Sequence, residues 1–199
     1  MTEIIDKSYF HELNNASPET LCRNGRCLYN SDTHQYNLEI WGGQYDIDPA
    51  NQTISQAPGD SPPLHEYFAI FAMYYLLRVQ DIPVQGQWVS EKDLPGGTTF
   101  FRGPHLIPTD LISNTFGNDL QNFKNRCIAL GGAQIDMADA AYSFHITADI
   151  PVAVLFWTGD EDFPAEAKIL YDQSIAEQLS LDIVWALAVG VCARISSFA

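Results

Sequence analysis

A short segment framed by glycine and proline, Arg102-Gly103-Pro104-His105, carries two side chains that could recognise an anion. It lies between an aromatic stretch and the expected start of a helix. A guanidinium and an imidazole beside a helix N-terminus suit a small anionic ligand such as a carboxylate or a phosphate. The structural alternative is that Arg102 pairs with one of the 25 acidic side chains and that His105 caps a turn. The sequence alone leaves both interpretations open.

Three consecutive carboxylates, Asp160, Glu161 and Asp162, form a second candidate site. Carboxylates that converge cannot all stay ionised without a countercharge. They would therefore hold a hard cation such as Mg²⁺ or Ca²⁺, or pair with a base such as Arg102. Neighbouring side chains of an extended loop diverge, however, and the alternating oxygen ligands and fixed glycine of a calcium loop are missing. A solvated hairpin tip is the favoured interpretation.

His65 is the third candidate for ligand binding. We expect it on a buried helix, on the same face as Ala69 and Ala72, where small side chains would let a ligand or another backbone approach closely. The alternative is a histidine whose ring nitrogens are satisfied within the core.

The cysteines raise the question of a metal or a disulfide. Cys22 and Cys27 have the spacing C-x4-C, whereas Cys127 and Cys192 are isolated in apolar, helix-like sequence. The spacing differs from the C-x2-C of a zinc knuckle, and no second close Cys or His pair completes four ligands. We expect no structural metal. Reduced thiols are the favoured interpretation in a cytosolic chain, and a redox-labile Cys22/Cys27 pair is the alternative.

Patterns of apolar residues predict the elements that must position these groups. Helical stripes and period-2 alternation indicate helices and strands respectively. The first three strands, with a two-residue turn at Gly42-Gly43, are predicted to form an antiparallel meander. His145 alternates with apolar neighbours, so its side chain should point away from theirs. The predicted helices cover about 3–15, 61–79, 109–130 and 180–195; the predicted strands cover 27–29, 36–40, 45–47, 144–146, 152–157 and 169–171, with two short extended pieces between 82 and 101.

The order of these elements predicts the fold class. Strands and helices do not alternate as βαβ units, which favours an α+β fold: a mostly antiparallel sheet packed with about four helices. A length of 199 residues is typical of one domain. We expect a single domain over 1–199, with an N-terminal helix and β-meander at 1–48, a surface loop at 49–63 and a helical and β core at 64–199.

Charge and hydropathy exclude several classes of partner. The chain has 25 acidic and 10 basic residues and a net charge of −15, so its surface should repel phosphate backbones and anionic lipids. We expect no nucleic-acid partner and no membrane partner. The longest apolar stretch, 183–193, is shorter than the roughly 20 residues of a spanning helix. The first residues resemble no secretory signal, so a cytoplasmic location is expected.

A combination of short motifs resembles a known family. The motifs are Asp93-Leu94-Pro95-Gly96-Gly97, the aromatic run leading into residues 102–105, and the run 159–164 (GDEDFP). They are similar to a domain-of-unknown-function family of anaerobic bacteria and archaea, some of whose members are fused to iron-sulfur modules. The resemblance implies a role near corrinoid or iron-sulfur metabolism. Because this chain has no cluster-binding cysteine motif, it also implies that any cluster lies on a partner protein.

Two functions from different classes are consistent with the sequence. The first is a binding or accessory protein for a small anionic ligand or for an iron-sulfur or corrinoid protein, with a site near Arg102, His105 and the 160–162 loop. It is favoured because the chain contains no G-x-S-x-G, H-E-x-x-H, P-loop or G-x-G-x-x-G motif. The second is a small enzyme in which Asp160 and Asp162 bind a divalent cation and His105 acts as general base.

Overall fold

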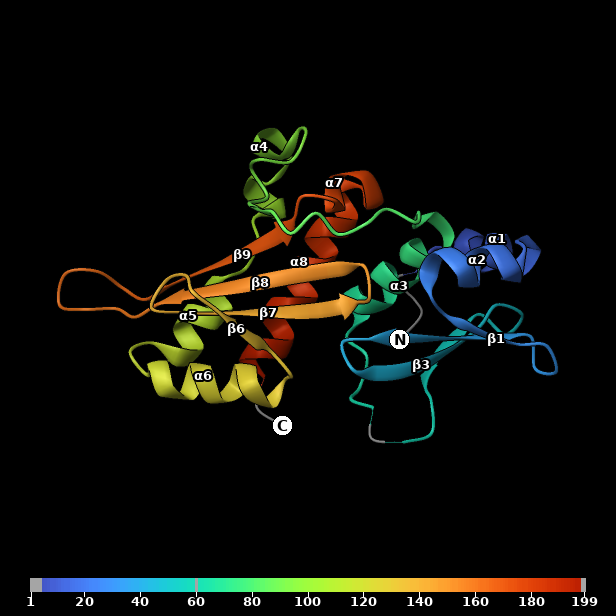
Figure 1. Cartoon of the computed structure of the whole chain (residues 1–199), viewed down its shortest axis with the longest axis horizontal. Coiled ribbons are helices and arrows are strands. Elements are labelled where there is room, and N and C mark those ends of the chain that lie inside the picture. Colours follow the sequence, from blue (N-terminus) through green and yellow to red (C-terminus); the bar gives the residue numbers. More distant parts are fainter. Residues whose placement is uncertain (1–4, 60, 198–199) are drawn as a thin grey trace.

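Two antiparallel sheets organise the chain, and helices pack between and around them (Figure 1). The structure is a computed structural model that describes residues 5–59 and 61–197. Within these residues, eight α-helices and the two sheets form a single compact α+β domain. The predicted fold class is confirmed. Three of the four predicted helices are present with shifted bounds and the fourth is divided in two, the strands are shared between two sheets, and short helices are added.

The first sheet is a four-stranded meander in the order β1-β2-β3-β4. Its strands are β1 (Leu28–Asn30), β2 (Gln35–Ile40), β3 (Gly43–Asp48) and β4 (Thr53–Gln56). The predicted meander is confirmed for the first three strands. The fourth strand lies inside 49–63, which was expected to be a surface loop. Ile54 is buried and pairs with Ile47, so one apolar residue is enough to add an edge strand to turn-rich sequence.

The turn between β2 and β3 differs from the prediction by one residue. Ile40 pairs with Gly43, so the two turn residues are Trp41 and Gly42, and their φ angles are 47° and 76°. Positive φ at both positions is typical of the type I′ hairpin turn. A large aromatic residue rarely adopts this conformation, so surrounding contacts must hold Trp41 in place.

The second sheet contains the β-rich last third of the chain. It has the order β5-β9-β8-β7-β6. Its strands are β5 (Trp88–Val89), β6 (Ala133–Ile135), β7 (Ala140–Thr147), β8 (Ile150–Trp157) and β9 (Glu166–Asp172). The predicted β8–β9 hairpin is present, and His145 is exposed between buried neighbours as the alternation requires. Of the two extended pieces expected between 82 and 101, one is β5 and the other region forms helix α4 (Gly97–Phe100).

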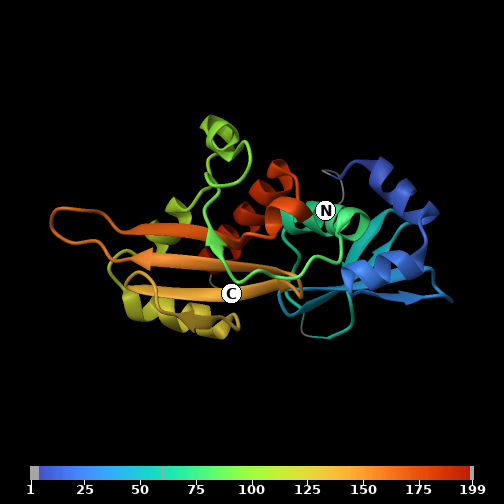
Figure 2. The same ribbon diagram turned by 45° about the horizontal axis from the view of Figure 1, so that its top comes forward.

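Two apolar helices join the sheets. Helices α3 (Glu66–Arg78) and α8 (Leu181–Ser196) lie side by side where the sheets meet (Figures 1 and 2). Both are apolar on most of their circumference, which is typical of helices buried on several sides. Their close approach requires Gly190, because an added Cβ would lie 3.1–3.2 Å from the ring of Phe68. One apolar core runs continuously through this junction.

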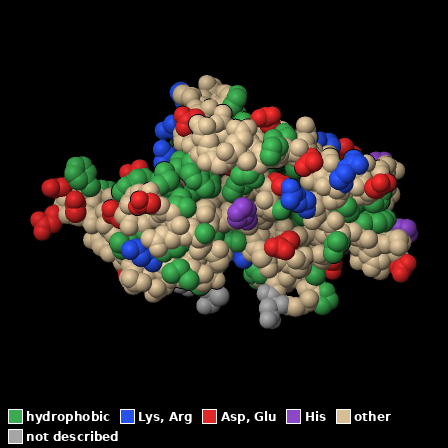
Figure 3. All heavy atoms as spheres, viewed as in Figure 1, with side chains coloured by type: hydrophobic (Ala, Val, Ile, Leu, Met, Phe, Trp, Pro, Cys, Tyr) green, Lys and Arg blue, Asp and Glu red, His purple; other side chains and the backbone are tan. Residues whose placement is uncertain are grey.

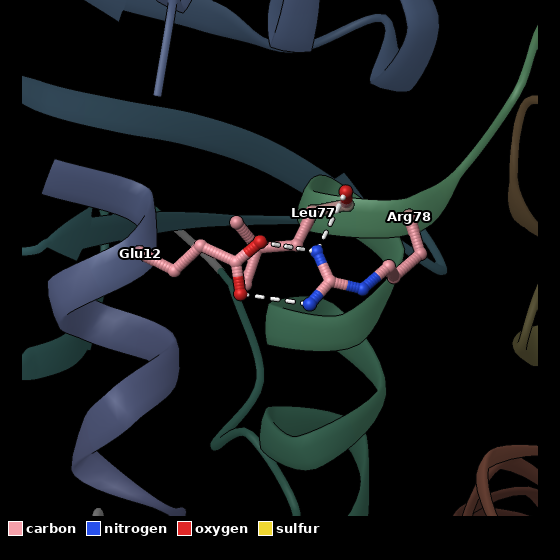
Figure 4. A network of polar contacts seen from close by, with 3 residues as sticks. All are labelled: Glu12, Leu77 and Arg78. Carbon is pink, nitrogen blue, oxygen red and sulfur yellow. Dashed lines mark hydrogen bonds and ion pairs between the residues drawn. The ribbon is translucent and has the colours of Figure 1, made fainter. Parts of the chain in front are cut away.

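The remaining helices cover the outside of the core. They are α1 (Lys7–Asn15), α2 (Pro18–Gly25), α5 (Asp110–Phe116), α6 (Leu120–Ala129) and α7 (Ile175–Gln178). Helix α1 packs against α3, and the guanidinium of Arg78 donates two hydrogen bonds of 2.5 and 2.7 Å to the carboxylate of Glu12 (Figure 4). The single helix predicted over 109–130 is wrong: Gly117, with φ of 53°, ends α5, and the Asp119 side chain caps α6.

The beginning of α3 also differs from the prediction, which placed it at Ser61. The helix starts at Glu66, and His65 is its N-cap residue. The Nδ1 atom of His65 accepts the amide proton of Tyr67 at 3.3 Å. His65 is therefore at the end of the helix and not on the interior face shared by Ala69 and Ala72.

No helix within 5–59 and 61–197 combines the length and the apolar character that membrane crossing requires.

Candidate functional site

The three acidic residues 160–162, called the acidic tip from here on, lie at the end of the β8–β9 hairpin. All three side chains are exposed. Asp160 Oδ1 accepts the amide protons of Asp162 and Phe163, both at 2.8 Å, and so closes the turn of its own loop. The hairpin projects from one end of the molecule, where acidic side chains gather (Figures 1 and 3). Asp160 is thus occupied in shaping the loop, and solvent surrounds the tip.

Arg102 and His105 lie in a different part of the molecule. Arg102 is exposed, precedes the 3₁₀ turn Gly103–His105, and makes no ion pair with any residue that the structure describes. The ring of His105 stacks on Phe100, with centroids 4.4 Å apart and planes inclined by 12°. In both views this segment, next to α4, stands apart from the β8–β9 loop (Figures 1 and 2). Residues 102–105 and 160–162 therefore do not converge on one site.

A row of aromatic rings connects His105 with His65. The rings of Trp185 and His105 are nearly perpendicular with centroids 5.8 Å apart, and those of Tyr67 and Trp185 are nearly perpendicular with centroids 5.3 Å apart. Tyr67 in turn stacks on His65, with centroids 5.6 Å apart. Two of the predicted residues, 40 positions apart, thus belong to one half-buried surface. No sequence pattern indicated this, because Trp185 comes from the distant helix α8.

His65 lines a cavity of about 510 Å³ that the sequence did not predict. We call it the basic pocket. Its walls are mostly apolar, and its lining contains two arginines, one histidine and no carboxylate among the described residues. The lining residues are Tyr45, Pro62, Pro63, Leu64, His65, Phe68, Arg126, Leu130, Ala193, Arg194 and Ser197. A volume of this size is within the range of roughly 300–1,000 Å³ that is typical of small-molecule sites.

Arg194 is the half-buried cation of this pocket. Its guanidinium lies over the ring of Trp41, 4.6 Å from the centroid, in a cation–π contact. Within the described residues it makes no hydrogen bond and no ion pair. Burial lowers the pKa of Arg194, because removing the cation from water disfavours the charged form. Its charge is therefore partly buried, and no described carboxylate compensates it.

Trp41 is fixed firmly enough to hold this cation. It is 5% exposed, and its Nε1 donates to the carbonyl of Leu130 at 3.0 Å. Its ring also packs on Phe68 and Phe144, with centroids 6.0 and 4.8 Å away. These contacts explain how the chain keeps a tryptophan at positive φ, and they place an aromatic face beneath the Arg194 guanidinium.

Arg126 contributes a second positive charge from helix α6. Its guanidinium donates to the carbonyl of Ile195 at 3.2 Å, to that of Arg194 at 2.7 Å, and to that of Ser197. A cation at a helix C-terminus interacts favourably with the unpaired carbonyls there. Arg126 therefore fixes the end of α8 that presents Arg194, and it adds to the positive potential of the pocket.

His65 can offer a hydrogen-bond donor to the same cavity. Because Nδ1 accepts the amide proton of Tyr67, the proton of the neutral ring lies on Nε2. Nε2 can then donate to an anionic group in the pocket, alongside the guanidinium of Arg194. Tyr45 is a weaker candidate, since its hydroxyl already donates to the carbonyl of Pro62 at 2.8 Å.

A second cleft, of about 250 Å³, lies beneath residues 101–107. Phe101 and Leu106 line it, but Arg102 and His105 do not. Two acidic and two basic side chains also line it, namely Glu91, Glu166, Lys92 and Lys168. Opposite charges in one small cleft compensate each other, so this cleft has less preference for an anion than the basic pocket.

The divalent-metal hypothesis finds no ligand set in the described part of the chain. No group of three or more His, Cys, Asp or Glu side chains there is placed to hold a metal ion. His105 stacks on Phe100, and the acidic tip is elsewhere, so the general base and the metal ligands of the proposed enzyme are not neighbours.

Comparison with known proteins identifies a family but no activity. A family model described as Domain of unknown function (DUF3786) matches residues 17–194, nearly the whole chain. The chain matches no curated protein and no solved structure.

Proposed function

The chain belongs to the family described as Domain of unknown function (DUF3786), and within it we propose a binding protein whose basic pocket holds a small amphipathic anion. One observation carries this proposal. In a protein with a net charge of −15, the half-buried Arg194 faces an apolar cavity whose described lining contains no carboxylate.

The energetics of Arg194 favour an anionic ligand. Removing a cation from water without an ionic partner costs free energy, which the contact with Trp41 offsets only in part. An anion that enters the pocket would supply the missing partner. The apolar side chains around it, including Leu64, Phe68 and Leu130, would then contact an apolar body attached to that anion.

The preferred ligand class is a monocarboxylate with an apolar body. A guanidinium presents two parallel donors that match the two oxygens of a carboxylate. Only one of the two arginines has its donors available by the described contacts, because Arg126 binds the carbonyls at the end of α8. The strongly negative protein as a whole disfavours ligands with several negative charges.

The sites near Arg102, His105, Asp160 and Asp162 remain weaker proposals. Arg102 and Asp162 are exposed, and Asp160 closes its own turn, so an anion or a cation bound there would stay in water. His65 is the predicted ligand-binding residue that the basic pocket supports.

The metabolic setting is a separate proposal. From the family resemblance we infer a cytoplasmic accessory role near corrinoid or iron-sulfur proteins. Protein purified without oxygen should then show an absorbance band of a corrinoid or tetrapyrrole, or should retain an iron-sulfur protein as partner. A colourless preparation with no bound partner would count against this setting, and it would leave the basic pocket to be tested on its own.

The pocket is tested with a matched ligand series. Straight-chain carboxylates from hexanoate to dodecanoate and the primary amides of the same chains are compared by thermal shift and titration calorimetry. We expect carboxylates to stabilise the protein and amides to do so much less. Arg194→Gln should weaken carboxylate binding about 10- to 100-fold, the value of one hydrogen-bonded charge pair.

The matched control is Arg102→Gln, which removes the same charge from an exposed position. It should leave carboxylate binding unchanged. Equal binding of acids and amides, or equal losses in the two arginine variants, would overturn the assignment of the basic pocket.

A further inference from the structure

Two of the four cysteines lie in contact at the start of the first sheet. Cys22 is in the last turn of α2, and Cys27 follows two residues after the helix ends. Between them Arg26 adopts a left-handed conformation with φ of 49°, which turns the chain back on the helix. As a result, Cys27 Sγ donates a hydrogen bond to Cys22 Sγ at a distance of 3.0 Å.

The turn that carries the pair is anchored on both sides. The Asn24 side chain donates to the carbonyl of Val79 at 3.4 Å, and Arg26 forms an ion pair of 2.8 Å with the buried Asp149. These contacts connect the turn to the end of α3 and to the β7–β8 turn. The fold therefore holds the two sulfur atoms together before any bond forms between them. A disulfide would need them to approach by roughly 1 Å, since a bonded pair lies at about 2.05 Å.

The two thiols differ in access. Cys22 is half-buried and can be reached from solvent, whereas Cys27 is 6% exposed and lies behind it. This arrangement separates an outer sulfur that can attack a disulfide in solution from an inner one that can only react with its neighbour. Burial also raises the pKa of Cys27, so the inner thiol has to give up its proton as it attacks, and the thiolate that leaves Cys22 can take up that proton.

The other two cysteines supply an internal contrast. Cys127 and Cys192 are fully buried in the core and have no cysteine neighbour among the described residues. Burial raises the pKa of each to about 12, as it also raises that of Cys27, so what sets these two thiols apart from the pair is the lack of a neighbouring cysteine among the described residues. Such thiols behave as small apolar side chains and react slowly.

We propose that Cys22 and Cys27 form a thiol–disulfide exchange site that reacts with low-molecular-mass disulfides. In the first step Cys22 attacks a disulfide RSSR, one RSH leaves, and a mixed disulfide forms on Cys22. In the second step Cys27 attacks the Cys22 sulfur, the second RSH leaves, and the Cys22–Cys27 disulfide forms. The two cysteine thiols lose two electrons and two protons in total, and RSSR gains them as two RSH. The reverse exchange with excess RSH restores the dithiol.

The site lies on α2 and on the turn between α2 and β1, and it shares no residue with the basic pocket. Its test is therefore independent of the ligand experiment described above.

The experiment equilibrates the reduced protein with mixtures of oxidised and reduced glutathione, followed by acid quenching. Free thiols are then counted in the denatured chain, and peptides are mapped by mass spectrometry without reduction. We expect the count to fall from four thiols per chain to two as the mixture becomes more oxidising. The only linked peptides should join Cys22 to Cys27, and excess reduced glutathione should restore all four thiols.

Two variants separate the steps. In Cys27→Ala the mixed disulfide with glutathione should accumulate on Cys22, because no second thiol resolves it. In Cys127→Ala, the matched control, the same loss of two thiols should occur from a starting count of three. The proposal is overturned if the wild-type protein keeps four thiols in oxidised glutathione, or if it holds glutathione on Cys22 without an internal bond.

If Cys27→Ala does not fold, the variant Cys22→Ser tests the first step instead, because it removes the half-buried thiol. Glutathione should not attach to its remaining buried Cys27. Attachment there at the rate seen for the wild-type pair would contradict the assignment of Cys22 as the sulfur that attacks the small disulfide.

Discussion

The acidic tip and the basic pocket are both charged regions, but the tip is exposed and the pocket is partly enclosed. At the tip three neighbouring carboxylates stand in water, where solvent screens each charge. In the pocket Arg194 is held against Trp41 among apolar side chains, and its pKa is lowered by burial. Charge density along the sequence is higher at the tip. The pocket has fewer charges, but an anionic ligand would gain more free energy there, because a partly buried charge has lost its hydration and has no ionic partner.

The largest effect is expected when the aromatic ring beneath Arg194 is removed. Trp41→Ala should lower the free energy of unfolding by about 3–5 kcal/mol, since it empties a core position and removes the hydrogen bond to Leu130. Urea denaturation measures the loss. Trp41→Phe keeps an aromatic face for Arg194 and should lose clearly less. Equal losses in the two variants would show that the ring does not support the pocket.

A buried carboxylate tests whether burial, and not the sign of the charge, decides how much a charged side chain affects stability. Asp172 is 2% exposed and accepts the amide protons of Gln85, Gly86 and Ser174 at 3.0, 2.6 and 3.0 Å. Burial alone would raise the pKa of Asp172, but the hydrogen bonds outweigh burial and lower it.

Because the pKa of Asp172 is lower in the folded than in the unfolded state, its stabilisation is present above about pH 4. That stabilisation is lost as the pH falls through the folded-state pKa. Asp172→Asn should lower the free energy of unfolding at neutral pH by about 1–3 kcal/mol. It should also flatten the decline of stability below pH 4, as followed by thermal melts across pH. An acid decline as steep as in the wild type would refute this account.

The smallest effect is expected at the acidic tip. Asp162→Asn removes one exposed charge that makes no side-chain hydrogen bond among the described residues. The free energy of unfolding should change by less than about 0.5 kcal/mol, measured in the same urea titrations. A loss of stability comparable to that of Asp172→Asn would mean that Asp162 makes a stabilising contact and is not simply solvated.

Local patterns predicted much of the fold. The alternation at 144–146, the apolar runs of β8 and β9, and the charged hairpin tip all follow from side-chain period and turn chemistry, and the structure contains them. The prediction was wrong where the local sequence favours two structures about equally, such as a continuous or a broken helix, or a loop or a strand. Gly117 divided one predicted helix into two, and a single buried Ile54 turned part of an expected loop into β4.

The candidate site was much harder to predict. Of the five residues singled out, His65 lines the basic pocket, and it does so as a helix cap and not as the core residue expected. No local pattern indicated Arg126 or Arg194. Arg194 is a single cation near the end of the apolar helix α8, and Arg126 lies close to Lys124 near the end of the more polar helix α6. The C-x4-C spacing was the one local signal for the thiol pair, and the left-handed turn at Arg26 supplied the contact.

The sequence by itself determined the α+β class, most elements, the strong negative charge and the absence of familiar catalytic motifs, because composition and short-range periodicity encode these properties. Only the tertiary structure decided that two arginines 68 positions apart share a pocket, and that residues 102–105 and 160–162 do not meet. Enclosure arises from packing between distant segments, here the joining of two sheets by α3 and α8. It sets the desolvation on which binding of an anion depends.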